Sequence, residues 1–143
     1  MVDRVGSIIE QALSFGKDTK SETEQRMQKF IITEDTHFQM EQIKAKSGVN
    51  MKDLISILVD AAYSVGDVAE YVPEDTRTRR WFVMMTPDVR HRLDELCRLA
   101  GGMSAGMMIG VIIHHVSMVP EVVNNNHFDL SDVIGRIDWR AEA

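Results

Sequence analysis

Residues 77–96, RTRRWFVMMTPDVRHRLDEL, decide the fold that we expect for this chain. The run from Trp81 to Met85 is apolar, short and preceded by arginines, which favours a strand over a helix. Thr86-Pro87-Asp88 follows it and has the features of a helix start. Threonine is a preferred cap, proline costs nothing at the first helical position, and an acidic residue suits the first turn. The stretch therefore predicts a strand that leads directly into a helix.

The same layout occurs earlier in the chain, where the short run Lys29 to Ile32, which is rich in β-branched residues, precedes Thr33-Glu34-Asp35. If Thr33 and Thr86 are equivalent, Gly48 and Gly101 follow them at the same distance. Asn50 and Ser104 are then the expected caps of the second helix in each copy, with one extra residue before Ser104. Apolar residues match at helical spacing in both copies. The matched pairs are Met40 with Leu93, Ile43 with Leu96, Leu54 with Met108, Ile55 with Ile109, Leu58 with Ile112 and Val59 with Ile113.

The order strand, helix, glycine turn, helix is thus expected twice. We place the first repeat at residues 27–68 and the second at 80–119, with a polar, proline-containing connector at 69–79. Residues 1–26 are expected to form an amphipathic helix and a linker, and residues 120–143 a C-terminal tail. The expected fold class is mainly α with a two-stranded antiparallel β-ribbon. A wholly helical bundle stays open as an alternative, because periodicity alone does not assign short apolar runs.

The repeat resembles the ribbon-helix-helix family, the class of the Arc and methionine repressors. The resemblance covers about residues 27–118 and rests on the strand, the Ser/Thr cap, the first helix, the glycine turn and the capped second helix. Members are usually homodimers that pair one strand from each chain, so two copies in one chain imply an intramolecular pseudo-dimer. The family's ribbon enters the DNA major groove. The resemblance therefore implies a sequence-specific DNA-binding protein, such as a transcriptional regulator or a plasmid or phage accessory factor.

Alternation along the two strands divides their side chains between two faces. The inward set is expected to be Phe30, Ile32, Trp81, Val83 and Met85. Met27 is expected outward, together with the candidate base contacts Lys29, Ile31, Arg80, Phe82 and Met84. This outer face is more apolar than the family pattern, so we expect thymine methyl groups, the chain's own N-terminal helix or a partner protein to cover it.

Basic residues at the ribbon ends and the N-termini of the second helices are candidates for phosphate contacts. The candidates are Arg26, Arg77, Arg79, Asn50, Lys52 and Ser104. The alternative is structural: the arginines between residues 77 and 98 would pair with nearby acidic residues, and Asn50 and Ser104 would be ordinary helix caps.

Composition limits the function further. A net charge of −6 over 143 residues argues against coating nucleic acid by bulk charge, but it allows a local basic patch. Cys97 has no internal disulfide partner and is expected to pack against the core. Neither a signal peptide nor a membrane span is expected, so we predict a cytoplasmic protein. Neighbouring His114 and His115 point apart on a helix and do not suit a metal, and we expect no enzyme activity and no cofactor.

A second function stays open from the sequence: a protein-interaction adaptor or anti-regulator that docks through Ile31, Phe82 and Met84. The acidic net charge and the apolar outer face favour it. If the partner is double-stranded DNA, one pseudo-dimer covers few base pairs, so we expect self-association or a second protein, through the ribbon face or the terminal segments, to strengthen binding.

Overall fold

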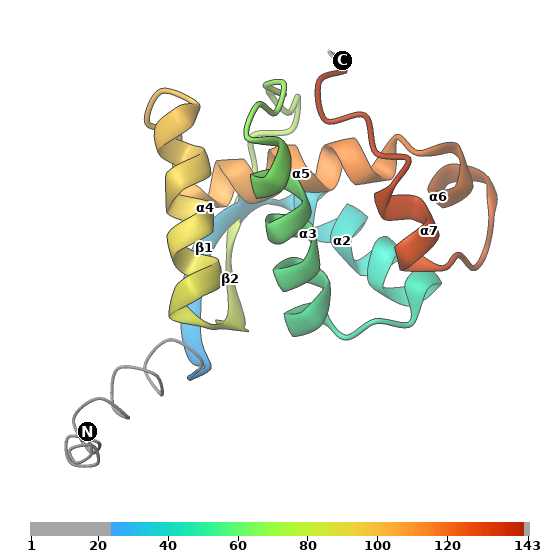
Figure 1. The fold of residues 1–143 in the computed structure, drawn as a ribbon, viewed down its shortest axis with the longest axis horizontal. Helices are drawn as coiled ribbons and strands as arrows, with labels where there is room; N and C mark the ends of the chain where they lie inside the picture. Colours follow the sequence, from blue (N-terminus) through green and yellow to red (C-terminus); the bar gives the residue numbers. More distant parts are fainter. Residues whose placement is uncertain (1–23, 142–143) are drawn as a thin grey trace, which may run out of the picture.

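A computed structural model describes residues 24–141 (Figure 1). Within that range the chain forms two strands and six helices. Their order is β1 (Arg26–Thr33), α2 (Glu34–Ser47), α3 (Met51–Val65), β2 (Thr78–Met85), α4 (Pro87–Leu99), α5 (Ala105–Ser117), α6 (Pro120–Asn124) and α7 (Leu130–Ile134). The expected class, mainly α with a two-stranded antiparallel sheet, is confirmed, and the wholly helical alternative is wrong. The amphipathic helix expected within residues 1–26 lies outside the described residues.

The two strands pair along their whole length, from Arg26 opposite Met85 to Thr33 opposite Thr78. β2 begins two residues before the expected start of the second repeat at residue 80, within the expected connector. These two residues belong to β2 because they pair with residues at the end of β1. Residues 66–77, without a helix or strand, join α3 to β2.

The expected division of the ribbon into two faces is confirmed. All five side chains expected inward are buried: Phe30, Ile32, Trp81, Val83 and Met85. The Phe30 and Trp81 rings lie opposite each other, 6.1 Å apart between centroids. The outward residues are exposed, except that Met84 is half-buried. Burial of one face fixes the register, because a slip by one residue would turn the apolar set to solvent.

Four side-chain caps start the four long helices at the expected positions. The Thr33 and Thr86 hydroxyls accept hydrogen bonds from the backbone three residues further on, and so do the side chains of Asn50 and Ser104. Each such cap contributes about 1 kcal/mol. After α2 and after α4 the chain turns through a glycine in the left-handed region, with φ of 71° at Gly48 and 85° at Gly101.

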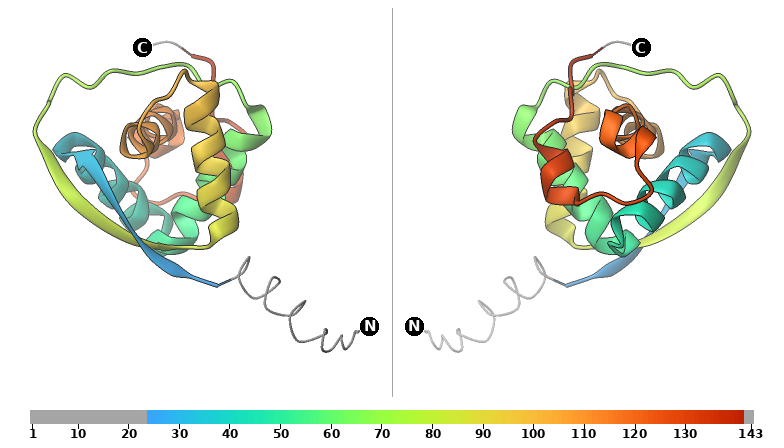
Figure 2. Two further views of the ribbon diagram at one scale, coloured as in Figure 1. Left: turned by 90° about the vertical axis from the view of Figure 1, so that its left-hand side faces the viewer. Right: turned by 90° about the vertical axis from the view of Figure 1, so that its right-hand side faces the viewer.

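All the long helices lie on one side of the ribbon, and α5 runs through the middle of the molecule (Figure 2). Packing crosses between the two repeats: α2 contacts α5, α3 contacts α4, α5 packs on β1 and α3 packs on β2. All twelve residues of the matched apolar pairs are buried, and so is Cys97. The two repeats therefore share one hydrophobic core.

The C-terminal tail closes the end of this core away from the ribbon. Its helices α6 and α7 bury Val122, Leu130 and Val133, and Trp139 is buried beyond them. The tail also holds the connector, because the Ala69 N–H donates to the Trp139 carbonyl at 2.8 Å. None of the helices in residues 24–141 combines the length and the apolar sequence needed to cross a membrane.

Candidate nucleic-acid interface

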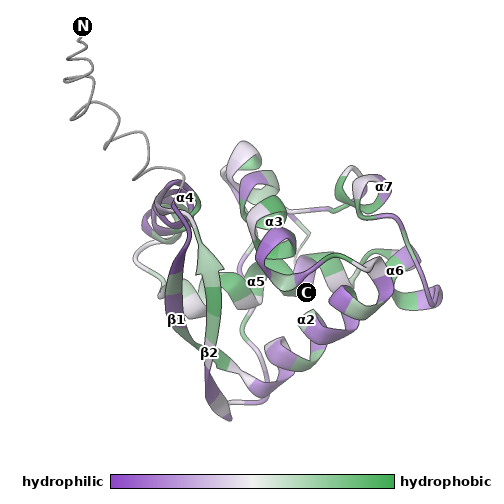
Figure 3. Ribbon diagram, turned by 90° about the horizontal axis from the view of Figure 1, so that it is seen from below, coloured by the Kyte–Doolittle hydropathy of each residue, from purple (hydrophilic) through white to green (hydrophobic). Residues whose placement is uncertain are grey.

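The outer face of the ribbon presents six side chains in three opposed pairs. Ile31 lies opposite Arg80, Lys29 opposite Phe82, and Met27 opposite Met84. The large apolar members are well exposed, Phe82 at 55% and Ile31 at 50%. Polar and apolar residues are both present on the ribbon, with the start of β1 hydrophilic and the end of β2 hydrophobic (Figure 3). All five residues expected to contact bases, namely Lys29, Ile31, Arg80, Phe82 and Met84, are brought together on this one surface.

The ribbon is basic in a chain that is acidic overall. Its two strands contain four basic residues and no acidic residue, whereas the chain carries a net charge of −6. Among the described residues, neither Lys29 nor Arg80 has an ion-pair or hydrogen-bond partner for its charged group. Both charges therefore face outward from the middle of an exposed ribbon, where a partner's negative groups could reach them.

The other arginines near the ribbon are engaged within the chain. Arg77 binds Asp75, with a shortest N–O distance of 2.7 Å, and its hydrogen bonds lower the pKa of Asp75 to about 2. Arg79 lies 3.5 Å from a Glu34 oxygen and 3.0 Å from Nδ1 of His37. The charges of Arg77 and Arg79 are therefore already partly balanced within the chain.

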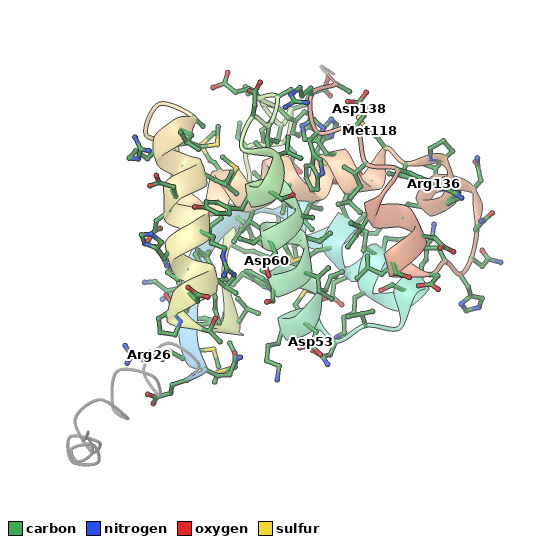
Figure 4. All side chains as sticks on the ribbon, viewed as in Figure 1. Arg26, Asp53, Asp60, Met118, Arg136 and Asp138 are labelled. Atoms are coloured by element: carbon green, nitrogen blue, oxygen red, sulfur yellow. The ribbon has the colours of Figure 1, made fainter. Side chains whose placement is uncertain are left out.

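Arg26 and the arginines of α4 also have acidic neighbours. Arg26, labelled in Figure 4, lies 3.8 Å from Glu24 at the exposed start of β1. On α4 the structural alternative is confirmed, because three arginines pair with acidic residues three or four positions away. These pairs are Arg90 with Asp94, Arg92 with Asp88 and Arg98 with Glu95.

The N-termini of α3 and α5 flank opposite ends of the ribbon. Lys52, in the first turn of α3, shares a small hollow with Met84 and Met85 at one end. At the other end Gly106, in the first turn of α5, lies against the backbone of Ile31 so closely that a Cβ at this position would stand 1.9 Å from the Ile31 carbonyl oxygen. The positive ends of two helix dipoles therefore lie beside the ribbon, where they could bind anions.

The two flanks differ in chemistry. Lys52 is exposed and has no partner among residues 24–141, and the Asn50 side chain both caps α3 and donates to Asp53. On the α5 side, Ser104 is an exposed cap, but the first turn holds neither an acidic nor a basic residue. Asn50 and Ser104 thus occupy equivalent places, whereas the position of Lys52 is taken by Gly106 on α5, so only the α3 flank carries a basic side chain in its first turn.

His114 and His115 have structural roles in α5. The His114 ring stacks on Tyr71 with 3.6 Å between centroids, and the His115 Nε2 atom lies 2.8 Å from the Ala69 carbonyl. Burial lowers the pKa of His114, and His115 beside it lowers that pKa further. Across residues 24–141, no three His, Cys, Asp or Glu side chains are grouped to hold a metal. Both histidines therefore hold the connector against α5.

Sequence reasoning missed a cavity at the α5 flank, between the end of β1 and the connector. Its walls come from segments far apart in the chain, and the only local signal was the pair of glycines at positions 106 and 110, one helical turn apart. No known protein family, curated protein or solved structure matches the chain. The geometry of the ribbon and its flanks is therefore what points to a function.

Proposed function

We propose that this chain is a sequence-specific DNA-binding protein with a single-chain ribbon-helix-helix architecture, acting as a transcriptional regulator or as a plasmid or phage accessory factor. One observation carries the proposal. The ribbon is exposed and basic, and it presents Lys29 and Arg80, neither paired within residues 24–141, between apolar side chains. A two-stranded ribbon has the dimensions to enter a major groove.

The strand register supports an intramolecular pseudo-dimer. Lys29 and Phe82 each precede their helix cap by four residues, so they are equivalent in the two repeats, and they lie directly opposite each other near the middle of the ribbon. A two-fold axis through this pair exchanges the repeats. The reciprocal packing of α2 on α5 and of α3 on α4 agrees with the same axis.

The outer face offers two kinds of base contact. The guanidinium of Arg80 can donate two hydrogen bonds to guanine O6 and N7, the commonest specific contact in the major groove, and Lys29 can donate to the same acceptors. Ile31, Phe82 and Met84 can contact thymine methyl groups. Because the axis exchanges Lys29 with Phe82 and Met27 with Arg80, the two halves of the ribbon present different chemistry to the bases. We expect a binding site that is not palindromic.

The flanks would position the ribbon on the phosphate backbone. Lys52 and the α3 N-terminus are the stronger anchor, because a basic side chain adds to the helix dipole there. Ser104 offers only the backbone N–H groups of α5. Arg26, Arg77 and Arg79 would contribute by exchanging their carboxylate partners for phosphates, which yields little net energy for exposed pairs. We expect the DNA to be held more tightly on the α3 side.

The proposal is tested by selecting binding sites from a random library of double-stranded oligonucleotides at moderate salt. We expect a short, asymmetric consensus to be enriched, and we expect Arg80→Ala to lose it. Arg98→Ala is the matched control, because Arg98 lies at the end of α4 and pairs with Glu95; this variant should enrich the same consensus as the wild-type chain. Failure of the wild-type chain to enrich any sequence would refute sequence-specific recognition.

A second candidate function is favoured by the exposed apolar side chains of the same face. Phe82, Ile31 and Met27 are each at least half exposed, which is unusual on a strand that meets only water. In this alternative the ribbon docks on a partner protein, and the chain acts as an adaptor or anti-regulator. Phe82→Ala would then abolish the interaction and Arg80→Ala would have little effect, whereas DNA binding requires Arg80 and depends steeply on salt.

A further inference from the structure

We infer that the cavity beside the α5 flank, which we call the flank cavity, is a binding site for a small neutral molecule of about the size of benzene that carries one hydrogen-bond-accepting oxygen. The cavity has a volume of about 170 Å³ and lies between the end of β1, the first half of α5 and the connector. The inference does not rest on the proposed DNA binding, because it follows from the volume and lining of the cavity alone. Ile31 and Ser104 lie at its exposed rim and are shared with the proposed DNA-binding surface.

Size and lining set the ligand class. An apolar cavity of about 150 Å³ inside a protein stays dry and takes up benzene or xenon. The walls of the flank cavity are mainly apolar, with Ile32, Val111, Tyr71 and Pro73 among them, and none of the described residues that line it carries a charge. A charged ligand would lose its hydration without gaining a counter-charge, so the ligand must be neutral.

Two threonine hydroxyls at the cavity wall provide one hydrogen-bond donor to a ligand. The Thr33 and Thr36 Oγ1 atoms lie 2.9 Å apart and share a single hydrogen bond, and Thr33 also accepts from the Thr36 backbone N–H. Two hydroxyls that share one hydrogen bond leave one O–H hydrogen without an acceptor among residues 24–141. Thr36 is only 5% exposed, and both hydroxyl-bearing residues line the cavity. An oxygen on the ligand would satisfy this hydrogen, which favours a phenol, alcohol, ether or ketone over a hydrocarbon.

The corresponding place at the α3 flank has no such cavity. Its hollow is about 40 Å³ and is bordered by Lys52, Asp53 and Ser56, so it is too small and too polar for this ligand. The matching positions on α5 are Gly106, Met107 and Gly110. The connector adds the further wall on the α5 side, where Tyr71 is fixed by its stack on His114. The flank cavity is thus a specific feature of the second repeat.

The mouth of the cavity offers a way to test binding without altering the core. Met107 lines the cavity and is 47% exposed, so a larger side chain there should close the mouth and leave the packing intact. Met118 is 48% exposed and stands at the opposite end of α5 (Figure 4), so Met118→Trp is a matched control. Ile31→Trp is a second plug if Met107→Trp does not fold.

The experiment is a titration of the full chain with phenol, toluene and benzoate, followed by two-dimensional amide NMR. We expect phenol to give saturable shifts centred on Gly106 and Gly110 and benzoate to give none. The shifts should disappear in Met107→Trp and persist in Met118→Trp. Toluene should bind about 2- to 12-fold more weakly than phenol, the span of one neutral hydrogen bond, and Thr36→Val should remove that difference.

Three outcomes would overturn the inference. Shifts that stay linear up to the solubility limit would show that there is no site, and shifts scattered over the surface would show that phenol binds elsewhere. Saturable shifts that survive both Met107→Trp and Ile31→Trp would place the ligand outside the cavity.

Discussion

Replacing Gly106 with alanine tests the packing between the two repeats. Gly106 belongs to the second repeat, and the backbone against which it packs, at Ile31, belongs to the first. An added Cβ would stand 1.9 Å from the Ile31 carbonyl oxygen and 2.9 Å from its carbon, whereas real Cβ atoms essentially never approach closer than 3.0 Å. The obstructing atoms are strand backbone, which cannot turn aside as a side chain could. The variant must therefore separate α5 from β1.

The expected cost of Gly106→Ala follows from that displacement. Overpacking a core costs about 1–3 kcal/mol, and a contact this short with backbone belongs at the upper end. The higher helix propensity of alanine offsets up to about 1 kcal/mol of this loss in stability. We expect the free energy of unfolding, measured by urea denaturation followed by circular dichroism, to fall by about 2 kcal/mol. Gly135→Ala is the control, because a Cβ there meets nothing within 4 Å, and it should change stability by less than about 1 kcal/mol. Equal stability of the two variants would refute the close approach of α5 to the ribbon.

Three further predictions concern the interface and its support. Arg80→Ala should weaken binding to the selected DNA site by about 1–3 kcal/mol and make the salt dependence shallower, whereas Arg77→Ala should cost less because Asp75 holds that guanidinium; equal losses in fluorescence anisotropy would contradict the assignment. Thr86→Ala should lower the free energy of unfolding by about 1 kcal/mol through loss of the α4 cap, and an unchanged urea midpoint would argue against this cap. The lowered pKa of His114 means that folding favours its neutral form, so stability should decline as the pH falls from about 7 to 5. His114→Phe should reduce that decline, and an identical pH profile would show that His114 is not its source.

Local features of the sequence were sufficient to predict the ribbon and the helix starts. Strand alternation has a period of two and depends only on which face is apolar, so Trp81 and Phe82 could be assigned to opposite faces without knowledge of the partner strand. Capping is equally local, because a side chain such as Thr33 satisfies an N–H three residues away. Because these signals have the same spacing in both halves of the chain, they also predicted the repeat.

Features that depend on distant segments were not predictable. Arg79 was a candidate phosphate contact, but its guanidinium lies beside Glu34 and His37, which come near it only when β2 pairs with β1. The flank cavity is formed by the connector and by two elements from different repeats, so no single stretch of sequence encodes it. The tail likewise gave no sign that Trp139 would bind the connector.

The central claim is that the outer face of the ribbon meets DNA bases, and site-specific photo-crosslinking at Phe82 tests it most directly. Phe82 would be replaced by the photoreactive residue p-benzoylphenylalanine, with the same replacement at Leu99 as control. The two side chains are equally exposed, at 55% and 54%, but Leu99 stands at the end of α4, outside the ribbon. In a mixture of genomic DNA and cell protein, we predict that the Phe82 variant crosslinks to double-stranded DNA and that the Leu99 variant does not. A crosslink from Phe82 to a discrete protein, with no DNA attached, would contradict the account.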